Sequence, residues 1–199
     1  MQTAIDQFRD NIARVKYLQA IHSSFSAITT NVLDLSDLLR LQIVMSVSAL
    51  DQYIHEIVRI GMIEVFEGRR PQPSGFLKFS VSMDRVLQSI IIGDSSWLDN
   101  EIRTRHGYLA FQQPDKIADA VRYISSIELW NEVGNLLGLP SADVKSQLRL
   151  IVDRRNKIAH EADLDPSFPN IHWPITPVLA QDTVHFIEML CEAIHSSVV

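Results

Sequence analysis

Arg154-Arg155-Asn156-Lys157-Ile158-Ala159-His160 lies near the end of a predicted helix, and the apolar residues around it decide how the chain is interpreted. Steps of four and three residues trace one helix face through Val144, Leu148, Ile151, position 155, Ile158 and Ala162. On this face, position 155 carries an arginine where another Leu or Ile is expected. A guanidinium on a face that a helix normally buries is costly unless it is paired or lines a wet cleft. Arg155 is therefore a candidate functional residue.

Helical periodicity continues through most of the chain, and neither strand alternation nor an internal repeat is evident. An amphipathic helix is predicted within residues 1–33, and a long second helix begins at Asp34 or Ser36 and ends near Gly68. Further helices are predicted over 82–92, over 97–111, from Asp115 to about 133, from Ser141 to a point before Pro166, and after the proline-rich stretch 166–177. We predict one all-α domain over residues 1–199, a helical bundle around the second helix and the helix that bears Arg155.

The composition, with 46% hydrophobic and 21% charged residues, is typical of a globular protein and not of a disordered chain. The net charge of −6 argues against sequence-independent coating of nucleic acid, because such coating needs a positive surface. A local basic cleft remains compatible with this charge. One basic run is interrupted only by Asp153 and contains Lys145, Arg149, Arg154, Arg155 and Lys157. Any RNA contact is expected to be focused there.

Cysteine content and hydropathy indicate the cellular compartment of the protein. The single cysteine, Cys191, rules out a disulfide within the chain and fits a reducing compartment. Asp6 and Asp10 interrupt the apolar residues of the N-terminus, so a signal peptide is not expected. The most apolar stretch, residues 41–50, is too short to span a bilayer. We expect a cytoplasmic protein with no membrane contact.

His160 follows Arg155 by five residues and supplies the second half of a possible reaction centre. Cleaving RNA without a metal needs a group to take the proton of the 2'-hydroxyl, a group to protonate the departing 5'-oxygen, and a cation at the phosphorus oxygens. Histidine suits either proton transfer at neutral pH. Arginine suits the third role because its planar fork matches two phosphate oxygens.

Helix geometry constrains how these two residues can act together. Residues five apart lie roughly 140° apart around a helix, so Arg155 and His160 do not share a face. Asn156 and His160, four apart, do share one. Two copies of this helix at a symmetric interface could place two arginines and two histidines around one cleft. We therefore expect a homodimer with a composite site.

Arg155-Asn156-x-x-x-His160, at the end of a helix in a small all-α domain, resembles the Arg-polar-x-x-x-His motif of the HEPN superfamily. The run Arg-Arg-Asn-Lys-Ile-Ala-His-Glu-Ala-Asp, residues 154–163, looks like the form found in the RiboL-PSP-type HEPN group. Residues 48–56 resemble the early long helix of that group, and residues 111–118 resemble its middle segment. The resemblance covers roughly residues 36–199 and is domain-scale.

This resemblance implies a metal-independent endoribonuclease that acts as a dimer, with Arg155 and His160 catalytic and Asn156 orienting them. HEPN proteins commonly serve in toxin–antitoxin, abortive-infection and other anti-phage systems, so a toxin or defence role is implied. RNA and a second copy of the chain are the expected partners, an antitoxin or effector protein is a further candidate, and no cofactor or metal is expected. Other HEPN members bind RNA, nucleotides or partners without cutting. A non-catalytic antitoxin, sensor or scaffold is therefore the alternative, and a purely structural dimerisation domain is a third.

Five further residues are candidates for supporting the site or binding RNA. Arg154 and Lys157 flank the catalytic pair in sequence. Asp51, His55 and Arg59 form a polar stripe, at steps of four, on the otherwise apolar second helix. That stripe could orient the Arg155/His160 pair or line the RNA cleft, and it could equally be an ion-pair network that faces solvent.

Overall fold

The computed structural model describes residues 1–30, 33–168 and 170–199. Within these ranges the chain forms eight α-helices and one short 3-10 helix, and the β-structure described is a single isolated bridge between Leu164 and His172. The prediction of an all-α helical bundle is confirmed. The elements are α1 (Gln2–Ile28), α2 (Ser36–Phe66), η1 (Phe76–Lys78), α3 (Met83–Ile92), α4 (Ser96–His106), α5 (Pro114–Val121), α6 (Leu129–Leu137), α7 (Ser141–His160) and α8 (Pro177–Val198).

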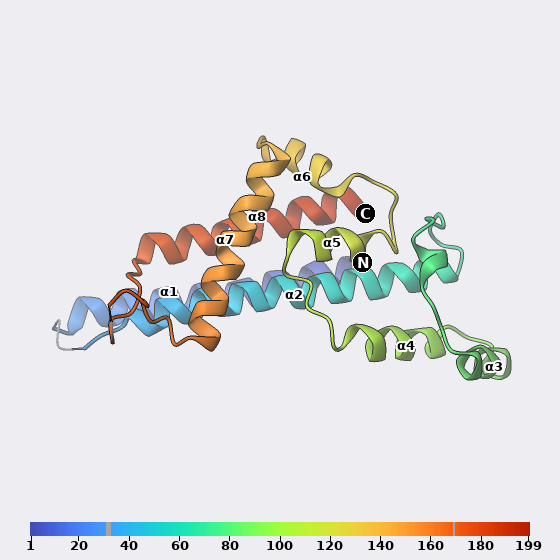
Figure 1. Ribbon diagram of the computed structural model, residues 1–199, viewed down its shortest axis with the longest axis horizontal. Helices are drawn as coiled ribbons and strands as arrows, with labels where there is room; N and C mark the ends of the chain where they lie inside the picture. The colour runs from blue at the N-terminus through green and yellow to red at the C-terminus, as the bar shows by residue number, and fades with distance from the viewer. Residues whose placement is uncertain (31–32, 169) are drawn as a thin grey trace.

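The long helix α2 is the centre of the bundle. It packs against α1, α4, α5, α7 and α8, and Figure 1 shows α1 lying along it while α7 crosses it. The buried apolar residues of α2 recur at steps of three and four, which is the spacing of a helix enclosed on several sides. They are Leu39, Ile43, Val47, Leu50, Ile54, Ile57, Val58, Met62 and Val65.

Helices α1 and α8 pack against each other as well as against α2. Two ion pairs join them at the surface, between Arg9 and Glu192 at 2.7 Å and between Lys16 and Glu188 at 2.7 Å. Each pair is partly exposed and so contributes little stability by itself, because water screens it. Apolar residues of both helices, Ile5 and Ile187 among them, are buried in the same core cluster.

Three predicted helix limits are wrong in detail. The helix predicted over 97–111 ends at His106, and the segment predicted to continue from Asp115 to 133 is two helices, α5 and α6. In both places the chain leaves the helix so that buried residues such as Phe111 and Ile124 reach the core from connecting segments. Ala162, expected on the stripe of the Arg155 helix, lies beyond the end of α7 with a φ of 51°. Val152, which is 1% exposed, continues the buried face instead.

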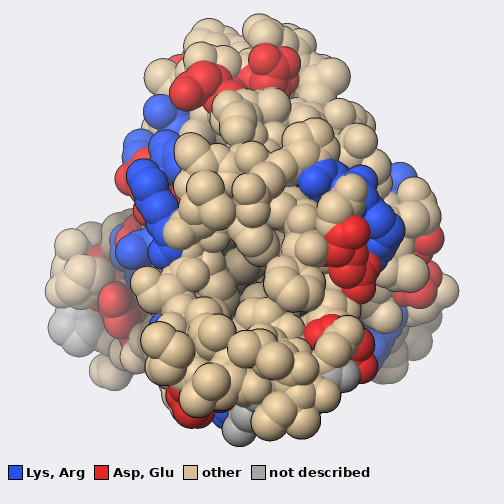
Figure 2. All heavy atoms as spheres, turned by 90° about the vertical axis from the view of Figure 1, so that its right-hand side faces the viewer, with Lys and Arg blue, Asp and Glu red and all other residues tan. Residues whose placement is uncertain are grey.

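Helix α3 projects at one end of the molecule, where it packs against α4. Its apolar residues Met83, Leu87, Ile90 and Ile91 are exposed. Figure 2 views this end directly, and uncharged atoms dominate its lower part, where α3 lies, while Lys and Arg gather along its left edge. The described helices include none that is long and apolar enough to cross a membrane.

Candidate functional site

Helix α7 is anchored to the core by its first three turns. Gly138 ends α6 in the left-handed region, at a φ of 67°, and Pro140 precedes the first residue of α7, as the turn composition predicts. Val144, Leu148 and Ile151 are then buried on one face. The last two turns of α7, which carry the motif, emerge from the core and are only partly buried.

Arg155 is half-buried on this emerging part of α7. Its Nη1 donates a hydrogen bond to Oδ1 of Asn156 at 2.9 Å. Its Nε is buried and has no hydrogen-bond partner among the described residues. Within the described part of the chain, no carboxylate lies at ion-pair distance from Arg155. The guanidinium therefore carries a positive charge that no neighbouring acid neutralises.

His160 is the last residue of α7 and is exposed. No hydrogen bond or ion pair joins it to Arg155 in the described part of the chain. This separation agrees with the different directions that the two positions take around a straight helix. One chain therefore presents the cation and the imidazole from the same helix without bringing them together.

The other two basic residues of the motif have partners within the chain. Nη2 of Arg154 donates to Oδ2 of the buried Asp163 at 2.8 Å. Lys157 lies 3.2 Å from a carboxylate oxygen of Asp153 and 5.6 Å from the centre of the Trp173 ring. Arg154 and Lys157 are thus engaged in holding the end of α7, and their predicted contact with RNA stays a prediction.

Asp51, on the predicted polar stripe of α2, contacts the segment before α5. Its Oδ1 accepts a hydrogen bond from the backbone N–H of Phe111 at 2.6 Å, and its Oδ2 accepts one from Gln112 at 3.0 Å. His55 lies next to it, with Nε2 at 3.8 Å from Oδ1 of Asp51. These contacts join α2 to the chain before α5, and none of those described involves Arg155 or His160.

Arg59 belongs to an ion-pair network between α2 and α4. It pairs with Glu56 at 2.6 Å and with Asp99, and Arg103 pairs with Asp99 at 2.9 Å. Burial acts to raise the pKa of Asp99, but the hydrogen bonds from Arg103 and Arg59 outweigh it, so the pKa lies below its ordinary value. Two cations are here matched by two carboxylates, and Arg59 is not free to bind an anion.

A cavity of about 210 Å³ lies beside this network and is lined by His55, Arg59, Ile102 and His106 among others. His106 is 4% exposed and its ring contacts those of Phe79, Phe111 and Tyr123. Burial, and secondarily the charge of His55, lowers the pKa of His106 to about 4. His106 is therefore neutral at physiological pH.

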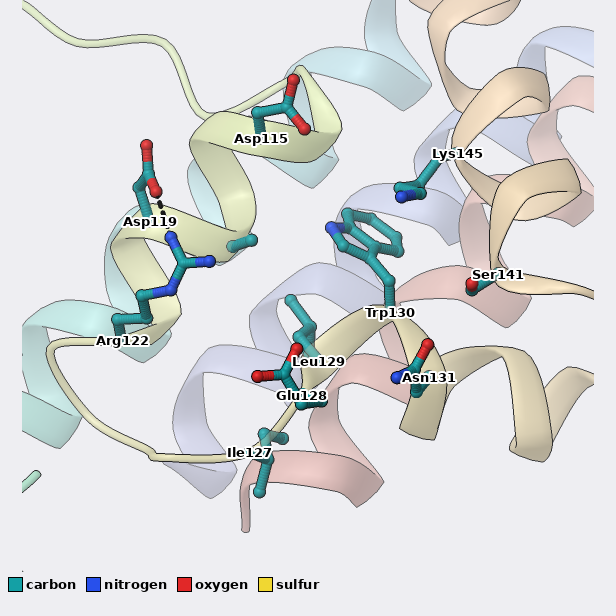
Figure 3. Close-up of a pocket in the computed structure, with 11 residues that line it drawn as sticks. Asp115, Asp119, Arg122, Ile127, Glu128, Leu129, Trp130, Asn131, Ser141 and Lys145 are labelled. Carbon is teal, nitrogen blue, oxygen red and sulfur yellow. Dashed lines mark hydrogen bonds and ion pairs between the residues drawn. The ribbon is translucent and has the colours of Figure 1, made fainter.

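A further cavity, of about 270 Å³, lies between α5, α6 and the start of α7. Figure 3 shows Trp130 and Lys145 on one side of it and the Asp119–Arg122 ion pair on the other. Lys145 precedes His160 by fifteen residues, which is roughly 22 Å along a helix. This cavity is therefore remote from the motif, and neither Arg155 nor His160 lines it or the cavity beside His106.

Two residues near the motif were not predicted as part of the site. Arg40 of α2 and Asp163 form a buried ion pair at 2.7 Å, next to Arg154. Arg40 was detectable from sequence, because it continues the buried row Ile43, Val47 and Leu50 in steps of three and four, just as Arg155 interrupts its own row. Asp163 follows the helix and gave no periodic signal.

Within residues 1–30, 33–168 and 170–199, no three His, Cys, Asp or Glu side chains are grouped so that they could hold a metal ion.

The all-α bundle, with its Arg-Asn-x-x-x-His motif at the end of a helix, has the features of a HEPN domain. The family model described as RiboL-PSP-HEPN matches residues 9–199, and the chain belongs to this family. HEPN-type families include ribonucleases. No curated protein matches the chain. No solved structure matches it either.

Proposed function

We propose that this protein is a metal-independent endoribonuclease. Arg155 binds and neutralises the scissile phosphate, His160 transfers the proton, and Asn156 orients Arg155. The observation that carries the proposal is the half-buried guanidinium of Arg155, which has no carboxylate partner among the described residues and is held by the neutral amide of Asn156. Burying such a charge costs free energy unless an anion pairs with it, and a phosphodiester is an anion whose two free oxygens match the guanidinium.

The reaction follows from the two side chains. The imidazole of His160 accepts the proton of the 2'-hydroxyl as its oxygen attacks phosphorus, and the imidazolium so formed returns a proton to the leaving 5'-oxygen. The guanidinium stabilises the charge that gathers on the phosphorus oxygens. Exposure of His160 at the end of α7 is compatible with a substrate as large as RNA.

The site requires a second copy of the chain in this proposal. Arg155 and His160 lie on different sides of α7, so a two-fold axis beside the helix end would bring Arg155 of one protomer to His160 of the other. The proposed biological setting is a cytoplasmic toxin or anti-phage role, in which RNA cleavage halts growth and an antitoxin or effector protein binds the enzyme. Asp51, His55 and Arg59 are proposed to support the site indirectly, through the position of α2.

The direct test is RNA integrity in the presence of EDTA. Wild-type protein is expected to cut RNA, whereas Arg155→Ala and His160→Ala reduce the rate by at least a hundredfold, since each removes a group acting in the transition state. Arg14→Ala on α1 and His185→Ala on α8 are matched controls, because both residues are exposed and lie on helices other than α7. Loss of activity in the controls, or uncut RNA with wild type, contradicts the proposal.

The composite site has its own test. Mixing Arg155→Ala protein with His160→Ala protein is expected to restore part of the activity, because one mixed dimer retains an intact arginine and an intact histidine on opposite chains. Light scattering should give the mass of a dimer. An active monomer, or mixtures that stay inactive despite subunit exchange, would require a site within one chain.

The alternative is a HEPN module that binds RNA or a protein without cutting. Its support is that no hydrogen bond or ion pair joins Arg155 to His160 in the described part of the chain, so a single copy holds no assembled reaction centre. In that case wild type leaves RNA intact in the EDTA assay, and its binding to RNA is unchanged in both motif variants.

A further inference from the structure

The turn that follows His160 has an unusual backbone. The N–H groups of Glu161 and Asp163 both donate to the carbonyl oxygen of Lys157, each at 3.0 Å. Ala162 and Asp163 adopt φ values of 51° and 56°, in the left-handed region that favours glycine. Two consecutive residues with side chains in this conformation need surrounding contacts that hold them there.

Asp163 supplies those contacts through a buried ion cluster. Its carboxylate is 1% exposed, and Oδ2 accepts hydrogen bonds from Nε of Arg40 at 2.7 Å and from Nη2 of Arg154 at 2.8 Å. Asp37, an exposed residue, gives Arg40 a second carboxylate at 3.3 Å. Burial lowers the pKa of Arg154, and the attraction of Asp163 opposes that shift. The carboxylate of Asp163 is therefore what keeps Arg40 and Arg154 paired in a poorly solvated place.

The same cluster joins three parts of the chain. Arg40 comes from α2, Arg154 from α7, and both donate to the carbonyl oxygen of Trp173, at 3.1 and 3.2 Å. The N–H of Trp173 in turn donates to the carbonyl oxygen of Asp163 at 2.8 Å. The end of α7 is thus fixed to α2 and to the segment before α8 through Asp163.

His160 lies in the segment between Arg154 and Asp163 that this ion cluster holds in place. It follows Arg154 by six residues and precedes Asp163 by three, so the Arg154–Asp163 pair spans the backbone that carries the imidazole. We infer that Asp163 is a positioning residue for His160: through Arg40 and Arg154 it fixes the backbone from which the imidazole acts. This inference rests on the proposed function for its catalytic meaning, and its structural content stands on the ion cluster alone.

Asp163→Asn tests the inference, with Asp165→Asn as the matched control. Asp165 lies two residues further along the same segment, and its Oδ1 accepts a hydrogen bond from the backbone N–H of Ser167. Both variants remove one negative charge near the motif. Asp163→Asn is expected to lower kcat for RNA cleavage at least tenfold without weakening RNA binding, because it loosens the backbone of His160 while Arg155 and Lys157 keep their contacts with Asn156 and Asp153. The control is expected to keep both kcat and KM within about twofold of wild type.

Partial unfolding lowers the apparent kcat and leaves KM unchanged, so kcat is calculated per mole of folded protein, with the folded fraction of each variant measured by urea denaturation. Unchanged kcat in Asp163→Asn, or kcat and RNA affinity that fall together, overturns the inference. Arg40→Lys is the second variant should Asp163→Asn fail to fold, because it keeps the charge and loses the fork of donors. It is expected to lower kcat severalfold, and an unchanged kcat there also overturns the inference.

Amide hydrogen exchange keeps the test independent of the proposed function. Asp163→Asn is expected to speed exchange at residues 158–163 and at Trp173 at least tenfold relative to Asp165→Asn, with α2 unaffected. This readout applies even if wild type cuts no RNA, which would remove the nuclease proposal alone. Equal exchange in the two variants would show that Asp163 does not hold the turn.

Discussion

Acidification should destabilise the protein through His106, and the size of this effect follows from its burial. The pKa of His106 is lowered from 6.5 to about 4, because the ring is buried among Phe79, Phe111 and Tyr123 and lies near His55. The unfolded chain binds a proton at this residue near pH 6.5, and the folded chain does so only near pH 4. Above pH 6.5 the imidazole is neutral in both states and does not affect the free energy of unfolding. That free energy then decreases as the pH falls from 6.5 toward 4.

The expected magnitude is about 2 kcal/mol at pH 5, rising to about 3 kcal/mol at pH 4, relative to pH 8. For a chain of this length, 2 kcal/mol corresponds to a fall in Tm of roughly 4–8 °C. Other groups also titrate in this range. The pH dependence of the free energy of unfolding should therefore be compared between wild type and a variant that lacks the imidazole.

His106→Phe is the suitable variant, because it keeps an aromatic ring in the cluster and removes the titrating group. Urea denaturation at pH 8 and pH 5 gives the free energy of unfolding of each protein at both values. The fall in that free energy is expected to be about 2 kcal/mol smaller in His106→Phe than in wild type. His185→Gln, which removes an exposed imidazole from α8, is expected to behave as wild type.

Equal pH dependence in wild type and His106→Phe would refute this reasoning. So would a pKa near 6.5 for His106 in the folded protein, measured by NMR titration of its ring protons. Either result would mean that water or a hydrogen bond solvates the buried imidazole.

Two further substitutions test how α7 is anchored. Leu148→Ala empties a fully buried position and should lower the free energy of unfolding by about 2–5 kcal/mol, whereas Leu150→Ala, at a position 68% exposed, should change it by less than about 0.5 kcal/mol in the same urea titration. Gly134→Ala would place a Cβ 2.7 Å from the carbonyl oxygen of Leu139 and should lower the free energy of unfolding by about 1–3 kcal/mol. Asn135→Ala, at the neighbouring exposed position, is the control. An unchanged stability in Gly134→Ala, or an equal loss in Asn135→Ala, would contradict the packing seen before α7.

Helix positions were largely predictable from the sequence, because burial imposes the period of 3.6 on apolar residues. The row from Ile43 to Met62 is an example, and α2 occupies nearly the predicted range. Helix ends were less predictable, since they depend on partners distant in the chain. The helix predicted over 97–111 ends at His106, and the N–H of Phe111 donates to Asp51, sixty residues away, a contact that no local sequence pattern predicts.

Arg40 and Arg155 illustrate what sequence can and cannot reveal about the candidate site. Each interrupts or extends an apolar row, and the sequence signal is the same for both. The structure distinguishes them: Arg40 is neutralised by Asp163, a residue 123 positions later, whereas Arg155 is bound by the amide of its neighbour Asn156. Whether a carboxylate neutralises a buried cation depends on residues distant in the chain, so the role of the cation can be assigned only from the fold.

The packing of α1 against α8 has a consequence for how the chain folds. Arg9 and Glu192 are 183 positions apart, and closing so long a loop costs chain entropy before the contact returns any stability. Individual helices form within microseconds, whereas this closure sets a slower step. Because each of the two helices covers apolar surface of the other, we expect them to detach together, and their amide protons to exchange as one cooperative unit.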